Sequence, residues 1–313
     1  MINDTKIILP GGAGLIGQNL VARLKAKGYT NIIVLDKHRA NLSILRQLQP
    51  GIEVEYADLA QAGTWKRHFI DAEVVVMLQA QIGGNDSQKF IRNNIDSTRL
   101  ILDEMKKNSV PYLVHISSSV VESIADDFYT NTKKEQEKMV LESGITGVVL
   151  RPTLMFGWFD RKHLGWLSRL MQKVPIFPIP GHGRYMRQPL YAGDFCNIII
   201  SCIEHRLKGD IYNISGLEYV EYIDIIREIK EAIHSKSIIT KIPYHLFFAL
   251  LWIWSLFDSN PPFTTQQLSA LVQNEEFEVI DWPNIFNISS TPFDKAIDET
   301  FNNPIYSNVK LEF

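Results

Sequence analysis

A tyrosine and a lysine stand four positions apart in the middle of the chain, at Tyr129 and Lys133. Residues i and i+4 of a helix share one face, so this spacing predicts that the lysine ammonium lies near the phenol. A positive charge there favours the ionised phenol and would lower its pKa from about 10 toward about 7, which is worth roughly 4 kcal/mol. A phenol tuned in this way can take the proton of an alcohol or return it to a carbonyl oxygen. The pair therefore indicates acid/base chemistry, although an exposed tyrosine and lysine would show the same spacing.

Three serines precede this pair and follow an apolar run over residues 112–116 that is typical of a strand. They are Ser117, Ser118 and Ser119. Parallel sheets bind ligands at the carboxyl ends of their strands, so a hydroxyl at this position can orient a substrate oxygen toward the tyrosine.

A glycine-rich turn begins near the N-terminus, where Gly12, Gly14 and Gly17 form the pattern G-x-G-x-x-G directly after Gly11. The turn follows an apolar strand and opens an amphipathic helix, which is the context that dinucleotide binding requires. Its glycines allow a tight turn and a close approach to a pyrophosphate, while the last one lets the helix pack near the strand. The pattern predicts a cofactor site over residues 11–17, including Leu15 and Ile16 at the start of the helix, rather than a turn without a ligand.

Acidic residues follow the second and third predicted strands. Asp36 lies nineteen residues after Gly17, where a carboxylate accepts hydrogen bonds from the adenosine ribose and repels a 2′-phosphate. This favours NAD over NADP. The three residues that follow are basic and could instead receive a phosphate: Lys37, His38 and Arg39. Asp58 is predicted to hold the adenine amino group, unless it only caps a loop, and Leu59 beside it is also predicted to bind the cofactor.

The elements that must position these residues alternate between strand and helix in the first half of the chain. The predicted strands are 6–9, 32–35, 54–56, 74–78, 112–116 and 147–150. Most are continuous apolar runs, as expected for parallel strands buried on both faces. The sequence predicts an α/β fold, with a Rossmann doubly wound parallel sheet over residues 1–155 and a smaller substrate-binding domain mainly over 156–313. Residues 189–214 are expected to return to the Rossmann domain, as a helix over 191–204 and a strand over 211–214.

The composition is that of a soluble globular protein: 313 residues, 45% hydrophobic, 21% charged, with a formal net charge of −3. That charge predicts no attraction to nucleic acid or to an anionic membrane. Cys196 and Cys202 are expected to be buried thiols in a reducing compartment, with no disulfide and no metal site. No secretory signal precedes the first strand, so we expect a cytoplasmic protein.

The longest apolar run covers residues 246–257 and is interrupted only by Ser255. It is shorter than the ~20 residues that a membrane span needs. We interpret it as a core helix, while a lining of an apolar substrate site or a contact with a membrane stays open.

Together these motifs resemble the extended and atypical short-chain dehydrogenases/reductases, the NAD-dependent epimerase/dehydratase family. The resemblance covers roughly residues 6–215 and extends to the segments 94–98, 151–152 and 187–194. It implies a Rossmann domain followed by a smaller substrate domain. It further implies that Ser118 takes the hydroxyl role, Tyr129 acts as acid/base, and Lys133 binds the nicotinamide ribose. Arg187 stands where sugar-nucleotide enzymes hold the substrate diphosphate, unless it is a structural arginine.

The resemblance implies an NAD-dependent oxidoreductase or epimerase that acts on a nucleoside-diphosphate sugar, and three departures bear on the substrate. Tyr129 lies only eleven positions after Ser118, so the active-site loop between them is shorter than is usual in the sugar-nucleotide members of the family. Ser119-Val120 replaces the Asp-Glu pair of the 4,6-dehydratases, which disfavours dehydration, and Leu154 replaces an asparagine that binds the substrate in many sugar epimerases.

Two other functions stay open. One is a sterol or lipid-alcohol dehydrogenase, which the apolar run suggests, and the other is a non-catalytic nucleotide-binding subunit. The sequence is also compatible with a homodimer.

Overall fold

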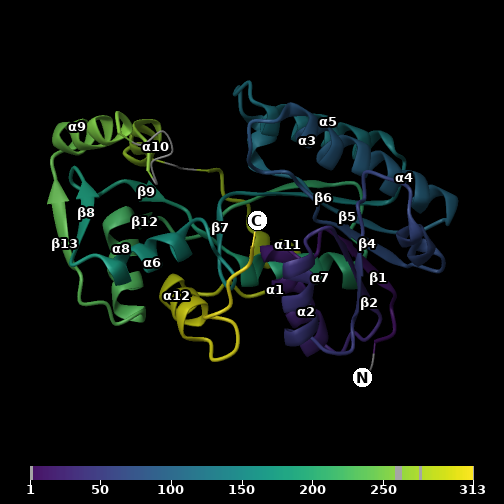
Figure 1. The fold of residues 1–313 in the computed structure, drawn as a ribbon. Coiled ribbons are helices and arrows are strands. Elements are labelled where there is room, and N and C mark those ends of the chain that lie inside the picture. Colours follow the sequence, from purple (N-terminus) through teal and green to yellow (C-terminus); the bar gives the residue numbers. More distant parts are fainter. Residues whose placement is uncertain (1–2, 258–262, 275–276, 313) are drawn as a thin grey trace.

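The computed structural model of the chain describes residues 3–257, 263–274 and 277–312. One seven-stranded sheet dominates the larger part of the molecule (Figure 1). Its strands are β1 (Ile7–Pro10), β2 (Ile32–Asp36), β3 (Glu53–Tyr56), β4 (Val74–Met77), β5 (Leu113–Ile116), β6 (Gly147–Pro152) and β11 (Ile211–Ile214). They are ordered β11-β6-β5-β4-β1-β2-β3, and every pairing is parallel. The order reverses between β1 and β4, which is the point where sheets of this kind bind ligands.

Helices cover both faces of this sheet, so the predicted α/β, doubly wound Rossmann fold is confirmed. One face packs against α1 (Leu15–Ala26), α2 (Arg39–Leu48), α7 (Ala192–His205) and α11 (Trp282–Phe286). The other packs against α4 (Ser97–Lys107), α5 (Phe128–Glu142) and a 3₁₀ helix over Thr64–Phe69. The short α3 (Ser87–Phe90) and a π-helical stretch (Ile91–Asp96) lead into α4, and a 3₁₀ turn (Ser119–Glu122) precedes α5.

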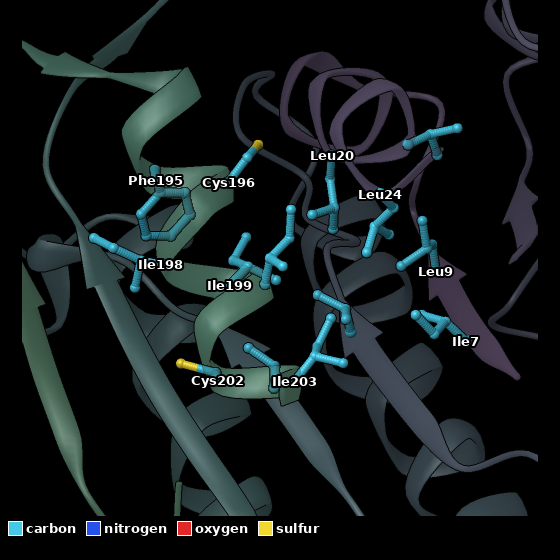
Figure 2. Packing of buried hydrophobic residues seen from close by; sticks show 14 of the residues in the cluster. Ile7, Leu9, Leu20, Leu24, Phe195, Cys196, Ile198, Ile199, Cys202 and Ile203 are labelled. Carbon is cyan, nitrogen blue, oxygen red and sulfur yellow. The ribbon is translucent and has the colours of Figure 1, made fainter. Parts of the chain in front are cut away.

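The packing of α7 against α1 joins the two halves of the sequence. In Figure 2, Cys196 and Ile199 of α7 lie on the side that faces Leu20 and Leu24 of α1, near strand β1. Both cysteines are buried and free, as expected, and burial raises the pKa of each thiol to about 12. Because β11 pairs with β6, residues after 190 complete the sheet that the first half begins. The division of the chain at residue 155 stays a prediction.

The smaller part of the molecule contains short strand pairs and the remaining helices. Strand β7 (Met155–Phe156) pairs with β10 (Leu190–Tyr191), β9 (Met186–Arg187) with β12 (Val220–Glu221), and β8 (Ile176–Pro180) with β13 (Ile238–Ile242). The helices are α6 (Leu164–Lys173), α8 (Tyr222–Ala232), α9 (Tyr244–Ser255), α10 (Thr265–Leu271) and α12 (Phe293–Asn302). Within the described residues, no helix has both the length and the apolar character needed to cross a membrane.

The interpretation of the longest apolar run as a core helix is wrong. The run forms α9, but no residue of this helix is buried. Only Tyr244, Phe247 and Leu251 are half-buried, on the side where α9 meets α10. Apolar composition predicts burial only where a second surface is available to cover the helix, and here α10 covers one narrow stripe.

Candidate functional site

A cavity of about 700 Å³ opens where the strand order reverses. Most of the residues predicted for the site line it: Gly11, Gly14, Leu15, Ile16, Gly17, Asp36, Asp58, Leu59, Ser118, Tyr129 and Lys133. Gly12 and Arg187 do not. The glycine turn, Asp36 and Ser118 lie at the carboxyl ends of β1, β2 and β5, and these ends meet at the cavity. Tyr129 joins them, although it lies 118 positions after Gly11 in the sequence.

The glycine turn has room only for backbone. Gly11 has a φ of +78°, and a Cβ there would lie 2.4 Å from the Gln79 backbone. A Cβ on Gly17 would lie 2.3 Å from the carbonyl oxygen of Gly12, so α1 approaches the turn as closely as a missing side chain allows. Gly12 therefore contacts Gly17 of α1 and does not line the cavity.

The first turn of α1 has the properties of an anion site. Its N-cap, Gly14, provides no side-chain hydrogen bond, and no acidic residue occupies the first turn. A Cβ on Gly14 would meet only the Gly11 carbonyl oxygen, at 3.7 Å, so the cradle beside it is open to the cavity. Exposed N–H groups at the positive end of a helix dipole suit a pyrophosphate, and these residues fit a dinucleotide.

Asp36 is fixed at the rim of this cradle by two backbone N–H groups. Its Oδ2 accepts from Ala13 at 3.0 Å, and its Oδ1 accepts from His38 at 2.9 Å. Of the three basic residues that follow it, Lys37 and His38 line the cavity, whereas the Arg39 guanidinium stacks on the Tyr56 ring at 3.8 Å. Burial lowers the pKa of Lys37, while the charges of Asp58 and Asp36 act in the opposite direction.

Asp58 and Leu59 lie on the same side of the cavity, two residues beyond the end of β3. The Asp58 carboxylate accepts from Arg92 and also from the Ala60 N–H at 3.2 Å. Its loop-capping bond does not exclude the predicted contact with adenine, which stays a prediction.

Ser118 and Tyr129 meet across the short loop between β5 and α5. Asp127 caps α5 by accepting from the Thr130 N–H at 2.9 Å, which places Tyr129 in the first turn of the helix. A hydrogen bond from Ser118 lowers the pKa of the Tyr129 phenol, but desolvation by burial is larger and raises it. The trimmed loop therefore still brings the serine hydroxyl to the phenol.

The Lys133 ammonium is buried and is held by two neighbouring acceptors. Lys133 is 1% exposed, and its Nζ donates to the Ile116 carbonyl at 3.0 Å and to Gln136 Oε1 at 2.5 Å. Burial lowers its pKa to about 7, although the Glu137 charge acts in the opposite direction. The shift in the pKa of Tyr129 comes from burial, Ser118 and Asp127, and its net direction is upward. The tuning of Tyr129 by Lys133 stays a prediction.

Gln136, which lies one helical turn beyond Lys133, was not among the predicted site residues. Its amide nitrogen donates to Thr98 Oγ1 at 2.8 Å, and Gln79 Nε2 donates to the same oxygen at 3.4 Å. This buried chain of amides fixes the oxygen that receives Lys133. The available signal was the i, i+3 spacing from Lys133, which puts Gln136 on the same face of α5.

Arg187 lies outside the cavity. Its guanidinium donates to the carbonyl oxygen of Gln273 at 2.6 Å and also to that of Leu271. These are the last carbonyls of α10 and the residues after it, where a cation is favourable. This geometry matches the structural alternative, and a contact with substrate stays a prediction.

The smaller part of the molecule also contributes to the lining of the cavity, through Leu154, Phe277 and a basic run over 161–163. Asp160 caps α6 with hydrogen bonds from the N–H groups of His163 at 2.9 Å and Gly165 at 3.0 Å. The cap holds Arg161, Lys162 and His163 against the cavity. Three consecutive basic residues were a signal that the sequence analysis did not use. Among the described residues, no cluster of histidine, cysteine or carboxylate side chains could hold a metal ion.

Comparison with known proteins gives concordant results. The model of the NAD dependent epimerase/dehydratase family matches residues 7–215. A 4-hydroxy-2-methyl-3-oxo-4-farnesyl-3,4-dihydroquinoline-1-oxide ketoreductase of Stigmatella aurantiaca is 23% identical over 261 residues, which are 76% of each chain. A UDP-glucose 4-epimerase of Vibrio cholerae is 21% identical over 277 residues, 80% of each chain. The structure of a UDP-glucuronic acid 4-epimerase from Bacillus cereus, in complex with NAD, shares the fold with a TM-score of 0.66 and 23% identity over 76% of this chain and 87% of that one.

Proposed function

Because the chain belongs to the NAD-dependent epimerase/dehydratase family, we propose that it oxidises or epimerises a ring carbon of a nucleoside-diphosphate sugar. Members of this family are enzymes of the extended short-chain dehydrogenase type, and this chain is one of them. The observation that carries the proposal is the shared cavity: the glycine turn, Ser118, Tyr129 and Lys133 all line it.

Different residues of the cavity would bind the cofactor, transfer the proton and orient the substrate in such a reaction. The glycine turn and the first turn of α1 bind the pyrophosphate of NAD, which supplies the acceptor for a substrate hydride. Tyr129 takes the proton of the substrate hydroxyl at its phenol oxygen, or returns it, as acid/base. Ser118, which hydrogen-bonds the phenol, orients the same substrate oxygen. Lys133, held by Gln136, fixes the wall of α5 beside the nicotinamide ribose.

We propose that the cofactor is NAD rather than NADP, because the Asp36 carboxylate lies at the rim of the phosphate cradle. Asp36→Asn removes the charge but keeps an oxygen that can accept one of the two N–H groups. We expect the preference for NADH over NADPH to narrow by roughly tenfold, since hydrogen bonds to charged groups contribute about 1.5–3 kcal/mol. Fluorescence titration of both cofactors measures this. Tighter binding of NADPH by the unmodified protein would show that Lys37 or His38 decides the preference.

The substrate assignment rests on a group of basic residues in the lining of the cavity. A diphosphate is dianionic or more, and the basic run over 161–163 lines the cavity. Charged hydrogen bonds from such side chains hold phosphates well. The Vibrio cholerae relative is a UDP-glucose 4-epimerase by name. We favour epimerisation over simple reduction narrowly, and dehydration is disfavoured because Ser119-Val120 replaces the Asp-Glu pair.

Calorimetry on NAD-loaded protein tests the substrate class, with UDP, UDP-glucose and a sterol as ligands. We expect UDP to bind, and Lys162→Ala to weaken it by roughly tenfold through the loss of a charged hydrogen bond. Lys173→Ala, an exposed lysine at the other end of α6, is the control and should leave binding unchanged. Arg187→Ala separates its two roles: lost UDP binding supports contact with the diphosphate, whereas a lower melting temperature with intact binding supports its anchoring of residues 271–273.

A lipid alcohol or ketone is the second candidate substrate. The name of the Stigmatella aurantiaca relative specifies a farnesyl-bearing ketone, and α9 exposes apolar side chains. In the same calorimetric series, micromolar sterol binding without any UDP binding would decide for this candidate.

We propose a cytoplasmic location, which the two free buried thiols support. A homodimer stays a prediction.

A further inference from the structure

Helix α9 exposes apolar side chains around most of its circumference. Trp252 is 55% exposed and Phe257, just beyond the helix, is 87% exposed. The other exposed apolar side chains are Leu246, Phe248, Leu250, Ile253, Trp254 and Leu256. At 3.6 residues per turn, these positions cover an arc of about 240°. The remaining arc contains Tyr244, Phe247 and Leu251, where the Tyr244 and Ser269 hydroxyls lie 3.3 Å apart and Phe247 packs edge-on against Phe263.

The charge around this helix is one-sided. Between residues 236 and 257 the sequence has two lysines, Lys236 and Lys241, one histidine and no acidic residue. Both lysines are exposed, and Lys241 lies in strand β13, which leads directly into α9. Residues 263–274, which include α10, have no charged side chain. Acidic residues follow both segments in the sequence, at Asp258 and at Glu275, Glu276 and Glu278, so the excess of positive charge is confined to residues 236–257.

The helix also has an accessible position. It lies at the outer end of the smaller part of the molecule, away from the seven-stranded sheet, above β8 and β13 and beside α10 (Figure 1). A flat surface can approach this end without meeting the larger part first.

We propose that α9 docks the protein on an anionic lipid membrane by entering the headgroup region. A 12-residue helix is only about 18 Å long, well short of the ~30 Å of a bilayer core, so it lies in the interface rather than across it. Tryptophan favours such interfaces, because its ring is largely apolar and its N–H is polar. Lys241, at the end of β13 that leads into α9, supplies an attraction to anionic headgroups.

The width of the exposed arc favours lipid over a second copy of the chain. A partner helix or a flat protein surface covers one face of a helix, whereas fluid lipid surrounds a partly immersed helix on three sides. An arc of about 240° matches the second situation.

Flotation with vesicles of equal parts phosphatidylcholine and phosphatidylglycerol tests the proposal. We expect the full chain to float with these vesicles, and less so with phosphatidylcholine alone or at high salt. The double variant Trp252→Gln/Ile253→Gln should lose binding by about tenfold or more, because two large apolar side chains no longer enter the interface. The control Ile70→Gln/Ile305→Gln changes side chains that are 54% and 58% exposed elsewhere, and it should float like the unmodified protein.

Melting temperature and NADH binding establish that each variant is folded. An unmodified protein that does not float, or a folded α9 variant that floats equally well, overturns the proposal. So does a dimer that the α9 variant abolishes in light scattering, without vesicle binding, since a second copy is then the occupant. These outcomes are independent of the substrate, because none of the changed residues lines the cavity.

Discussion

Replacing Tyr129 with phenylalanine is expected to lower turnover by about 10²–10⁴-fold, the range for losing a general acid/base. The change removes only the phenolic oxygen that hydrogen-bonds Ser118. The residues proposed to bind the cofactor, the glycine turn and Asp36, lie on other elements of the cavity wall, so we expect the affinity for NADH to stay nearly unchanged. Steady-state kinetics with the UDP sugar identified by calorimetry, together with NADH titration, measure both quantities.

Tyr219→Phe is the matched control, because this tyrosine is exposed and does not line the cavity. It should retain full turnover. A Tyr129→Phe enzyme with undiminished activity would show that another group moves the proton, and would remove the main support for the proposed mechanism.

Replacing Lys133 with methionine is expected to change how the stability of the fold depends on pH, while damaging turnover and cofactor binding. Burial lowers the pKa of Lys133 from 10.5 to about 7. A shift of this size corresponds to roughly 4 kcal/mol of destabilisation at neutral pH, because folding disfavours the ammonium. Methionine removes this cost but leaves the two acceptors on Ile116 and Gln136 unpaired, at about 1–3 kcal/mol each. The two effects are of similar size near pH 7, so the informative quantity is the pH dependence of the difference in unfolding free energy.

The pH dependence of this effect has a definite sign. Between pH 7 and 10.5 the unfolded chain binds a proton at Lys133 that the folded chain does not, so the stability of the unmodified protein rises with pH across this window. The unfolding free energy of Lys133→Met relative to the unmodified protein should therefore be highest at and below about pH 7, and should fall by roughly 4 kcal/mol as the pH approaches 10.5. Urea unfolding at several pH values measures it. Lys138→Met, an exposed lysine on the same helix, should show no such dependence; a pH-independent difference for Lys133→Met would contradict the buried ammonium.

Local sequence determined the scaffold and the cofactor cradle. Mostly apolar runs of three to five residues predicted parallel strands, since only strands covered on both faces need no polar side. The G-x-G-x-x-G turn predicted its own geometry, because Gly11 and Gly17 occupy positions where a Cβ would collide with backbone. Asp36 and Ser118 lie at or just beyond strand ends, so the topology of the sheet brings them to one cavity, and the cap of α5 at Asp127 adds Tyr129 from the first turn of that helix.

Tertiary structure decided what the longer side chains do. The i, i+4 spacing put Lys133 on the same helix face as Tyr129. Its ammonium, however, donates hydrogen bonds to Gln136 and to the Ile116 carbonyl, which only the folded packing brings near. Arg187 binds carbonyls that are 84 and 86 residues away in the sequence. The apolar run of α9 is exposed because α10 covers only one stripe of it. Backbone conformation and strand burial follow from neighbouring residues, whereas the partner of a flexible cation and the cover of an apolar helix come from distant segments, so no local pattern could predict them.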